Sequence, residues 1–249
     1  MRKELIATLS ILGSLAASGA AAAQTCATPP SCETLGFTKS ETDCDGLEAL
    51  KCPFDQSKLY CPQGGGNMSA AAPGAILYSD GTISDSVIAS KTPVGIVAYV
   101  NGSTGFAVAL TESNQTWGGY GYNVSCLGDM GSGAASADMN GRVNTQCLVS
   151  DSQTHPAANY CNTFSAVSSG KGSSGWYLPA AGELKAMSSN YDTINLGLQK
   201  LSKTQISSNY YWSSSELHRD GAWDVRLSAG TMHNYYKDIS RPVRCVLAF

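Results

Sequence analysis

Charge is scarce in this sequence, and there is no excess of basic residues. Asp, Glu, Lys and Arg together make up 14% of the 249 residues, the formal net charge is −3, and there are only three histidines. Proteins that bind nucleic acids need a basic face. The composition therefore argues against a nucleic-acid partner.

Several short motifs that carry enzyme chemistry are also missing. The glycine-rich stretch at 117–122 is not followed by the Gly-Lys-Ser/Thr of a phosphate-binding loop. There is no Cys-x-x-Cys pair, which is the usual zinc spacing, and no nucleophile elbow around a serine. We therefore expect no catalytic activity, no metal and no cofactor.

The N-terminus has the pattern of a secretory signal peptide. Basic residues at 2–3 precede an apolar run at 5–17 and four alanines at 20–23. The apolar run is shorter than the roughly 20 residues that span a membrane. Cleavage after Ala23 would leave 226 residues with a net charge of −4. The expected product is secreted or attached to the cell surface, with no membrane span in the mature chain.

Nine cysteines in an exported chain indicate disulfide bonds. The first group is Cys26, Cys32, Cys44, Cys52 and Cys61; the second is Cys126, Cys147, Cys161 and Cys245. Because five is an odd number, one thiol of the first group is free, pairs with the second group, or links to another chain as an oligomer. With the uncharged run at 62–74 as a linker, this divides the protein into a cysteine-rich module at 24–61 and a main domain at 75–249.

The main domain has signals for short strands and a few helices. Two β-type runs at 94–100 and 105–110, joined by a short segment with Asn-Gly, predict a hairpin. Helices are predicted at 156–164, at 179–190 with Pro179 in the first turn, and at 194–201. The glycine-rich middle at 116–151 is predicted to be an ordered loop with aromatic residues plugged into the core.

The C-terminal tail alternates apolar and polar residues, as a half-buried strand does. Trp223, Val225 and Leu227 would point inward at 222–228, and Asp224 and Arg226 would point to solvent. The alternation recurs at 243–249, which predicts a second strand that closes the chain against the same core.

Two motifs resemble a known family. Trp-x-Leu-Pro-x-x-x-Glu-Leu at 176–184 and Tyr-Trp-Ser-Ser at 211–214 resemble the DUF1566 family, also called the Lcl C-terminal domain, over residues 73–249. The resemblance implies an exported bacterial protein with an α+β, C-type-lectin-like fold of short helices around small antiparallel sheets. It also implies a structural disulfide between Cys161 and Cys245, and we expect Cys126 to pair with Cys147.

The tail also resembles the variable regions that diversity-generating retroelements rewrite at the adenines of Asn codons. In such tails Glu216, Trp223, Met232 and Lys237 would be framework positions, because Asn codons cannot mutate to these residue types in this way. The positions that would vary and bind ligand are Leu217, His218, Arg219, Asp220, Asp224, Arg226, Ser228, Thr231, His233, Asn234, Tyr235, Tyr236 and Asp238, with Ile239 and Ser240 beside them.

These residues favour adhesin-like binding of an extracellular glycan or a surface protein. Tyrosines, arginines and small polar residues on a rigid scaffold are typical of binding loops. Three alternatives remain. A relative of the formylglycine-generating oxidases would need a reactive, copper-binding cysteine pair. A calcium lectin would need a Glu-Pro-Asn or Gln-Pro-Asp triplet, which is absent. A structural surface protein would need no specific ligand.

Overall fold

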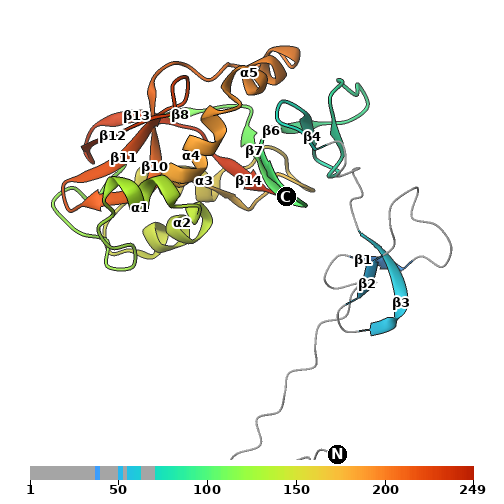
Figure 1. Ribbon diagram of the computed structural model, residues 1–249, viewed down its shortest axis with the longest axis horizontal. Coiled ribbons are helices and arrows are strands. Elements are labelled where there is room, and N and C mark those ends of the chain that lie inside the picture. The colour runs from blue at the N-terminus through green and yellow to red at the C-terminus, as the bar shows by residue number, and fades with distance from the viewer. Residues whose placement is uncertain (1–36, 40–49, 53–54, 63–70) are drawn as a thin grey trace, which may run out of the picture.

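The computed structural model describes residues 37–39, 50–52, 55–62 and 71–249 (Figure 1). The first three segments form an antiparallel sheet in the order β1-β3-β2, with β1 at Phe37–Lys39, β2 at Leu50–Cys52 and β3 at Asp55–Pro62. The expected signal peptide at 1–23 lies outside the described residues, as do most of the cysteine-rich module and linker positions 63–70.

A six-stranded antiparallel sheet forms one end of the main domain, in the order β5-β4-β6-β7-β14-β9 (Figure 1). Its strands are β4 (Ile76–Tyr78), β5 (Ile83–Ser84), β6 (Pro93–Asn101), β7 (Thr104–Ala109), β9 (Trp176–Tyr177) and β14 (Val246–Ala248). The predicted hairpin is confirmed as β6 and β7. Asn101 pairs with Thr104 across a two-residue turn, in which Gly102 takes the positive φ of 60° that this turn needs.

A second, three-stranded sheet in the order β10-β11-β12 lies at the other end (Figure 1). It consists of β10 (Tyr210–His218), β11 (Gly221–Arg226) and β12 (Thr231–Tyr236), and the pair of β8 (Ser113–Thr116) and β13 (Ser240–Val243) lies beside it. The closing strand predicted at 243–249 is wrong as a single strand. The chain leaves β8 after Val243 and joins β7 and β9 from Val246.

Five helices cover these sheets: α1 (Ser132–Ala137), α2 (Gly141–Ser150), α3 (Pro156–Thr163), α4 (Ala181–Ser188) and α5 (Tyr191–Lys200). The helix predicted at 156–164 is confirmed as α3. The one predicted at 179–190 begins later, because Ala180 is the N-cap and Pro179 precedes it. The helix predicted at 194–201 begins earlier, at Tyr191.

The prediction of an ordered loop at 116–151 is wrong for its second half, where α1 and α2 lie. α1 has only six residues, α2 contains the weak helix formers Gly, Val, Asn and Thr, and neither helix has a side-chain cap at its N-terminus. They are held by tertiary contacts instead: α1 packs against α4, and α2 packs against α3 and β10. Short helices of this kind gain their stability from packing, which local sequence does not reveal.

The six-stranded sheet and the strands β10 and β11 of the second sheet separate two hydrophobic cores, whereas β12 is largely exposed. On β6, Val97 belongs to one core and Ile96 to the other; on β10, Trp212 and Tyr211 are divided in the same way. The inward positions predicted for β11 are confirmed, since Trp223, Val225 and Leu227 are buried. The opposite face of β11 is only partly open to solvent, because Ala222 and Asp224 are fully buried and Arg226 is exposed.

Candidate functional site

The serines after Trp212 on β10 form part of a buried polar network. Asp138, at the end of α1, accepts hydrogen bonds from Asn144 Nδ2 of α2 at 2.8 Å and from Ser215 Oγ at 2.7 Å. Ser215 Oγ in turn accepts the backbone N–H of Ala181 at 3.0 Å. Three helices are thereby tied to one strand, which fixes the sheet that carries the candidate site.

Glu183, from the Leu-Pro-x-x-x-Glu-Leu motif, is a second buried anchor. Its carboxylate accepts the N–H of Ala180 at 2.8 Å and the hydroxyl of Tyr177 at 3.1 Å. Gly141 approaches so closely that a Cβ there would lie 2.2 Å from Glu183 Oε2. Burial raises the pKa of Glu183 to about 7. The motif is therefore a structural one that positions the start of α4.

We expect Glu183 to make the protein more stable as the pH falls from 8 to 5. Its folded pKa of about 7 lies above the ordinary value of 4.5, so the folded state holds a proton that the unfolded chain releases. This contribution is complete below pH 4.5 and is lost as the pH rises through 7; it amounts to about 3 kcal/mol. Urea unfolding at both pH values should show that the free energy of unfolding changes less with pH in Glu183→Gln than in the wild type. Identical slopes for the two proteins would contradict the assignment.

Glu216 and Lys237, both predicted framework positions, form a fully buried ion pair. Lys237 Nζ lies 2.5 Å from Glu216 Oε1 and also donates to the carbonyl of Tyr122 at 2.8 Å. The N–H of Val124 donates to both carboxylate oxygens of Glu216, and the Lys237 ammonium lies 4.7 Å from the centre of the Trp117 ring. This pair fixes the end of β10 and the loop that carries residues 117–124.

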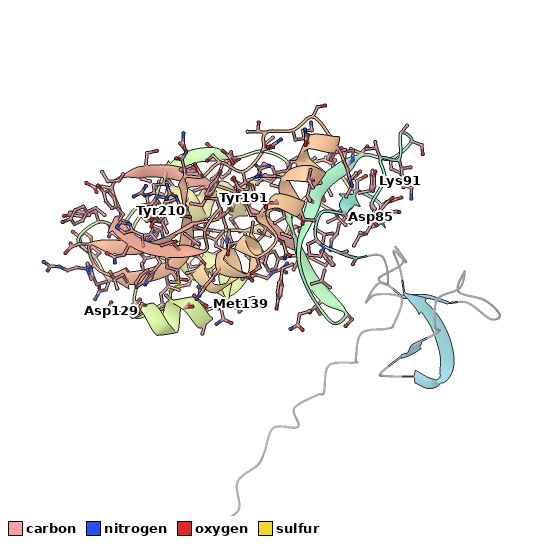
Figure 2. The ribbon with its side chains drawn as sticks, turned by 45° about the horizontal axis from the view of Figure 1, so that its top comes forward. Asp85, Lys91, Asp129, Met139, Tyr191 and Tyr210 are labelled. Carbon is pink, nitrogen blue, oxygen red and sulfur yellow. A yellow bond between two sulfur atoms is a disulfide. The ribbon has the colours of Figure 1, made fainter. Side chains whose placement is uncertain are left out.

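Aromatic rings follow one another from the second sheet to the loop at Tyr120 and define a tyrosine patch, in which Tyr210 is half-buried and the other rings are exposed. It consists of Tyr120, Tyr210, His233, Tyr235 and Tyr236, with Arg226 and Arg241 beside the rings. Successive ring centres are 5.3 Å apart from Tyr210 to His233, 5.7 Å to Tyr235, 5.8 Å to Tyr236 and 6.1 Å to Tyr120. Figure 2 labels Tyr210 at the end of the domain opposite Asp85 and Lys91.

The guanidinium of Arg241 lies among these rings. Its Cζ is 4.5 Å from the centre of the Tyr235 ring and 5.5 Å from that of Tyr210. Cation–π contact of this kind favours arginine over lysine. The tyrosine patch is thus ordered by stacking between side chains of β10, β12 and β13.

The prediction that Asp224 points to solvent is wrong, because its side chain is fully buried beneath the tyrosine patch. Its carboxylate lies 2.6 Å from Arg241 Nε and 3.3 Å from His233 Nδ1. Both are ion pairs by distance, although neither carboxylate oxygen makes a hydrogen bond of good geometry. Burial raises the pKa of Asp224, while the charge of Arg241 opposes that rise. Asp224 therefore supports the patch from below.

A hollow of about 440 Å³ opens between the β10–β11 turn and β12. It is lined by His218, Asp220, Gly221, His233, Asn234, Tyr235 and Tyr236. The volume lies within the roughly 300–1,000 Å³ of small-ligand sites. The hollow and the tyrosine patch share His233, Tyr235 and Tyr236, so we treat them as one candidate binding site.

The structure leaves most of the predicted binding residues accessible to solvent. The exposed ones are His218, Arg219, Arg226, Ser228, Thr231, His233, Asn234, Tyr235, Tyr236 and Asp238. Leu217 and Asp220 are half-buried, and Asp224 is buried. Of the framework positions, Glu216, Trp223 and Lys237 are buried and Met232 is half-buried.

Three members of the site do not follow from the tail pattern: Tyr120, Tyr210 and Arg241. Tyr210 stands two positions before the buried Trp212, so strand periodicity alone predicts a core position for it and not a place in the patch. Tyr120 lies 90 residues earlier in the chain. Arg241 belongs to a different strand pair, so only the tertiary structure brings these two residues to the patch.

The comparisons with known proteins give a likeness of fold. No family model matches the chain, and no curated protein matches it. Among solved structures, the chain is similar to a fimbrial protein from Bacteroides ovatus, with 18% identity and a TM-score of 0.58. The match covers 72% of this chain and 49% of that one, so it spans about half of the fimbrial protein. The two proteins share a fold over this region.

Other parts of the described chain have fewer features of a binding site. A hollow of about 360 Å³ lies between α5 and residues 73–74, but it has no aromatic lining. Within the described residues, no group of three His, Cys, Asp or Glu side chains is arranged to hold a metal ion. No helix among them is long and apolar enough to cross a membrane.

Proposed function

We propose that this protein is an adhesin-like cell-surface protein that binds an extracellular glycan or surface protein through the tyrosine patch and its hollow. The observation that carries the proposal is the run of exposed aromatic rings on a sheet whose own core is fully packed. Tyr235 and Tyr236 are 40% and 57% exposed, whereas Trp212 of the same sheet is fully buried. Tyrosine and arginine are the side chains that most often dominate binding energy.

Two further observations support a surface role. The main domain contains two disulfides, Cys126–Cys147 and Cys161–Cys245, which are typical of exported proteins. The solved structure that shares the fold is described as a fimbrial protein. Cys161 and Cys245, the pair that a copper-dependent oxidase would need in an open groove, are instead joined and fully buried, which favours binding over oxidase chemistry.

The distribution of exposure also favours a diversified tail on a C-type-lectin-like, DUF1566-type domain. The residue types that Asn codons cannot reach are buried or half-buried, and almost all of the proposed variable positions are accessible. Asp224 is the exception. This part of the proposal predicts a reverse transcriptase gene nearby, with a near-copy of the tail that has Asn codons at the variable positions. Sequencing the neighbouring DNA tests it, and an isolated gene would contradict it.

We expect simultaneous replacement of Arg219, Arg226, Tyr235 and Tyr236 by alanine to abolish ligand binding. All four side chains are exposed, so the melting temperature should stay within a few degrees of the wild-type value. Binding is measured with the labelled protein on arrays of extracellular glycans and surface proteins. A matched variant with Leu196→Ala and Lys203→Ala, both exposed near the other hollow, should bind as the wild type does. Full binding by the quadruple variant would place the site elsewhere.

A further inference from the structure

Hydrogen-bond donors gather around the ring of Tyr210. The Cζ atoms of Arg226 and Arg241 each lie 5.5 Å from the centre of this ring, and the imidazole of His233 lies 5.3 Å away. Arg226 is exposed, and its Nε donates to the carbonyl of Ser208 at 2.9 Å. In the part of the chain that the structure describes, this bond holds the guanidinium at one nitrogen, with the two terminal amino groups left for a ligand.

The charge of this cluster is only partly balanced. Asp224 is the carboxylate that pairs with Arg241 and His233, and because it is fully buried no ligand can reach it. Arg226, Arg241 and Asp224 together leave one positive charge, on a chain whose net charge is −3. A guanidinium group has no acceptor. The ligand group that binds here must therefore supply acceptor oxygens, and a carboxylate or sulfate supplies them with the complementary charge.

The adjoining hollow has a different chemistry. Its lining combines the rings of Tyr235 and Tyr236 with the polar side chains of His218, Asp220 and Asn234, and includes no aliphatic side chain. Sites for peptide helices or drug-like ligands are lined mostly by apolar side chains. Aromatic rings next to short polar side chains suit a ligand that has C–H faces and many hydroxyl groups, as a sugar does.

The arginine cluster beside Tyr210 and the hollow lie at opposite ends of one strand. Arg226 is the last residue of β11, and Asp220 immediately precedes its first residue. At about 3.3 Å per residue their backbones are roughly 20 Å apart. His233 and Tyr235 connect the two ends, because their rings lie side by side on the neighbouring strand. A ligand that uses both ends must therefore be longer than one sugar ring.

We propose that the ligand is an acidic oligosaccharide. Its carboxylate or sulfate group binds to Arg226 and Arg241 beside Tyr210, and its hydroxyl-bearing rings extend over Tyr235 into the hollow. Asp220, at the far end, accepts hydrogen bonds from hydroxyl groups. This inference rests on the proposed function and specifies the ligand class for the same site.

The test compares oligosaccharides that differ only in the acidic group. Suitable probes are sialyllactose against its carboxyl-reduced form, and a glucuronate tetrasaccharide against its carboxyl-reduced form, in titration calorimetry. We expect the acidic member of a pair to bind at least about tenfold more tightly, the effect of one or two charge-assisted hydrogen bonds. Arg226→Gln should remove that preference and leave the melting temperature within a few degrees of the wild-type value. Lys203→Gln, which removes an exposed charge outside the site, should keep the preference.

Each contrary outcome has a separate meaning. Equal affinity for acidic and neutral members, or a preference that survives Arg226→Gln, would overturn the acidic ligand. If poly-glutamate binds more tightly than any oligosaccharide and loses that binding in Arg226→Gln, this result would mean that the ligand is an acidic polypeptide and not a sugar. In both cases the proposed function stands, provided that the quadruple variant loses whatever binding is found. Binding retained by the quadruple variant would instead contradict the proposed function itself.

Discussion

Lys237→Met should lower the free energy of unfolding by about 3–5 kcal/mol, because it leaves Glu216 buried without its cationic partner. Both side chains are fully buried, and the ammonium also donates to the carbonyl of Tyr122. Burial already raises the pKa of Glu216 with the lysine in place. Without the lysine the carboxyl group should take up a proton more readily, so the loss should be smaller at pH 5 than at pH 8. Urea unfolding at the two pH values measures both effects.

Two variants control this experiment. Adding Glu216→Gln to Lys237→Met removes the unpaired charge and keeps an acceptor for the N–H of Val124, so the double variant should be more stable than Lys237→Met alone. Lys203→Met, at an exposed position, should change stability by no more than about 0.5 kcal/mol. Equal losses for Lys237→Met and Lys203→Met would mean that the pair is not buried as described.

Removal of the Cys161–Cys245 disulfide by alanine substitution at both positions should cost about 4–5 kcal/mol. The bond joins α3 to the segment before β14 across 84 residues, and loop-closure entropy grows with the length of chain enclosed. The same change at Cys126 and Cys147, which are 21 residues apart, should cost about 3 kcal/mol. Denaturant unfolding of the two double variants gives the comparison.

The two disulfides should also differ in their reactivity toward reductants. Cys161 and Cys245 are fully buried, whereas Cys126 is exposed. Mild dithiothreitol should therefore reduce Cys126–Cys147 first, as peptide mapping after alkylation would reveal. If the buried bond opened first, or if the shorter loop proved the more stabilising, the roles given to the two bonds would be reversed.

The expected disulfide pairs are both present, and several elements follow from local pattern. The hairpin of β6 and β7 could be predicted from two β-type runs and a turn with Gly102 alone. The core positions of Trp223 and Val225 could be predicted from strand periodicity alone. Helices α1 and α2 were missed because α1 is short, α2 is rich in weak helix formers, and the stability of both comes from packing on α4 and β10.

The sequence by itself determined that Trp223 and Val225 pack into the core and that the tail carries aromatic and charged side chains, because alternation along a strand is a property of neighbouring residues. Only the tertiary structure decided how they combine. The burial of Asp224 depends on Arg241, which reaches it from a strand paired with β8. The patch is completed by Tyr120, from a loop tied down by Lys237 and Glu216. Periodicity can assign a residue to one face of a strand, but whether that face meets solvent depends on segments that are remote in the sequence.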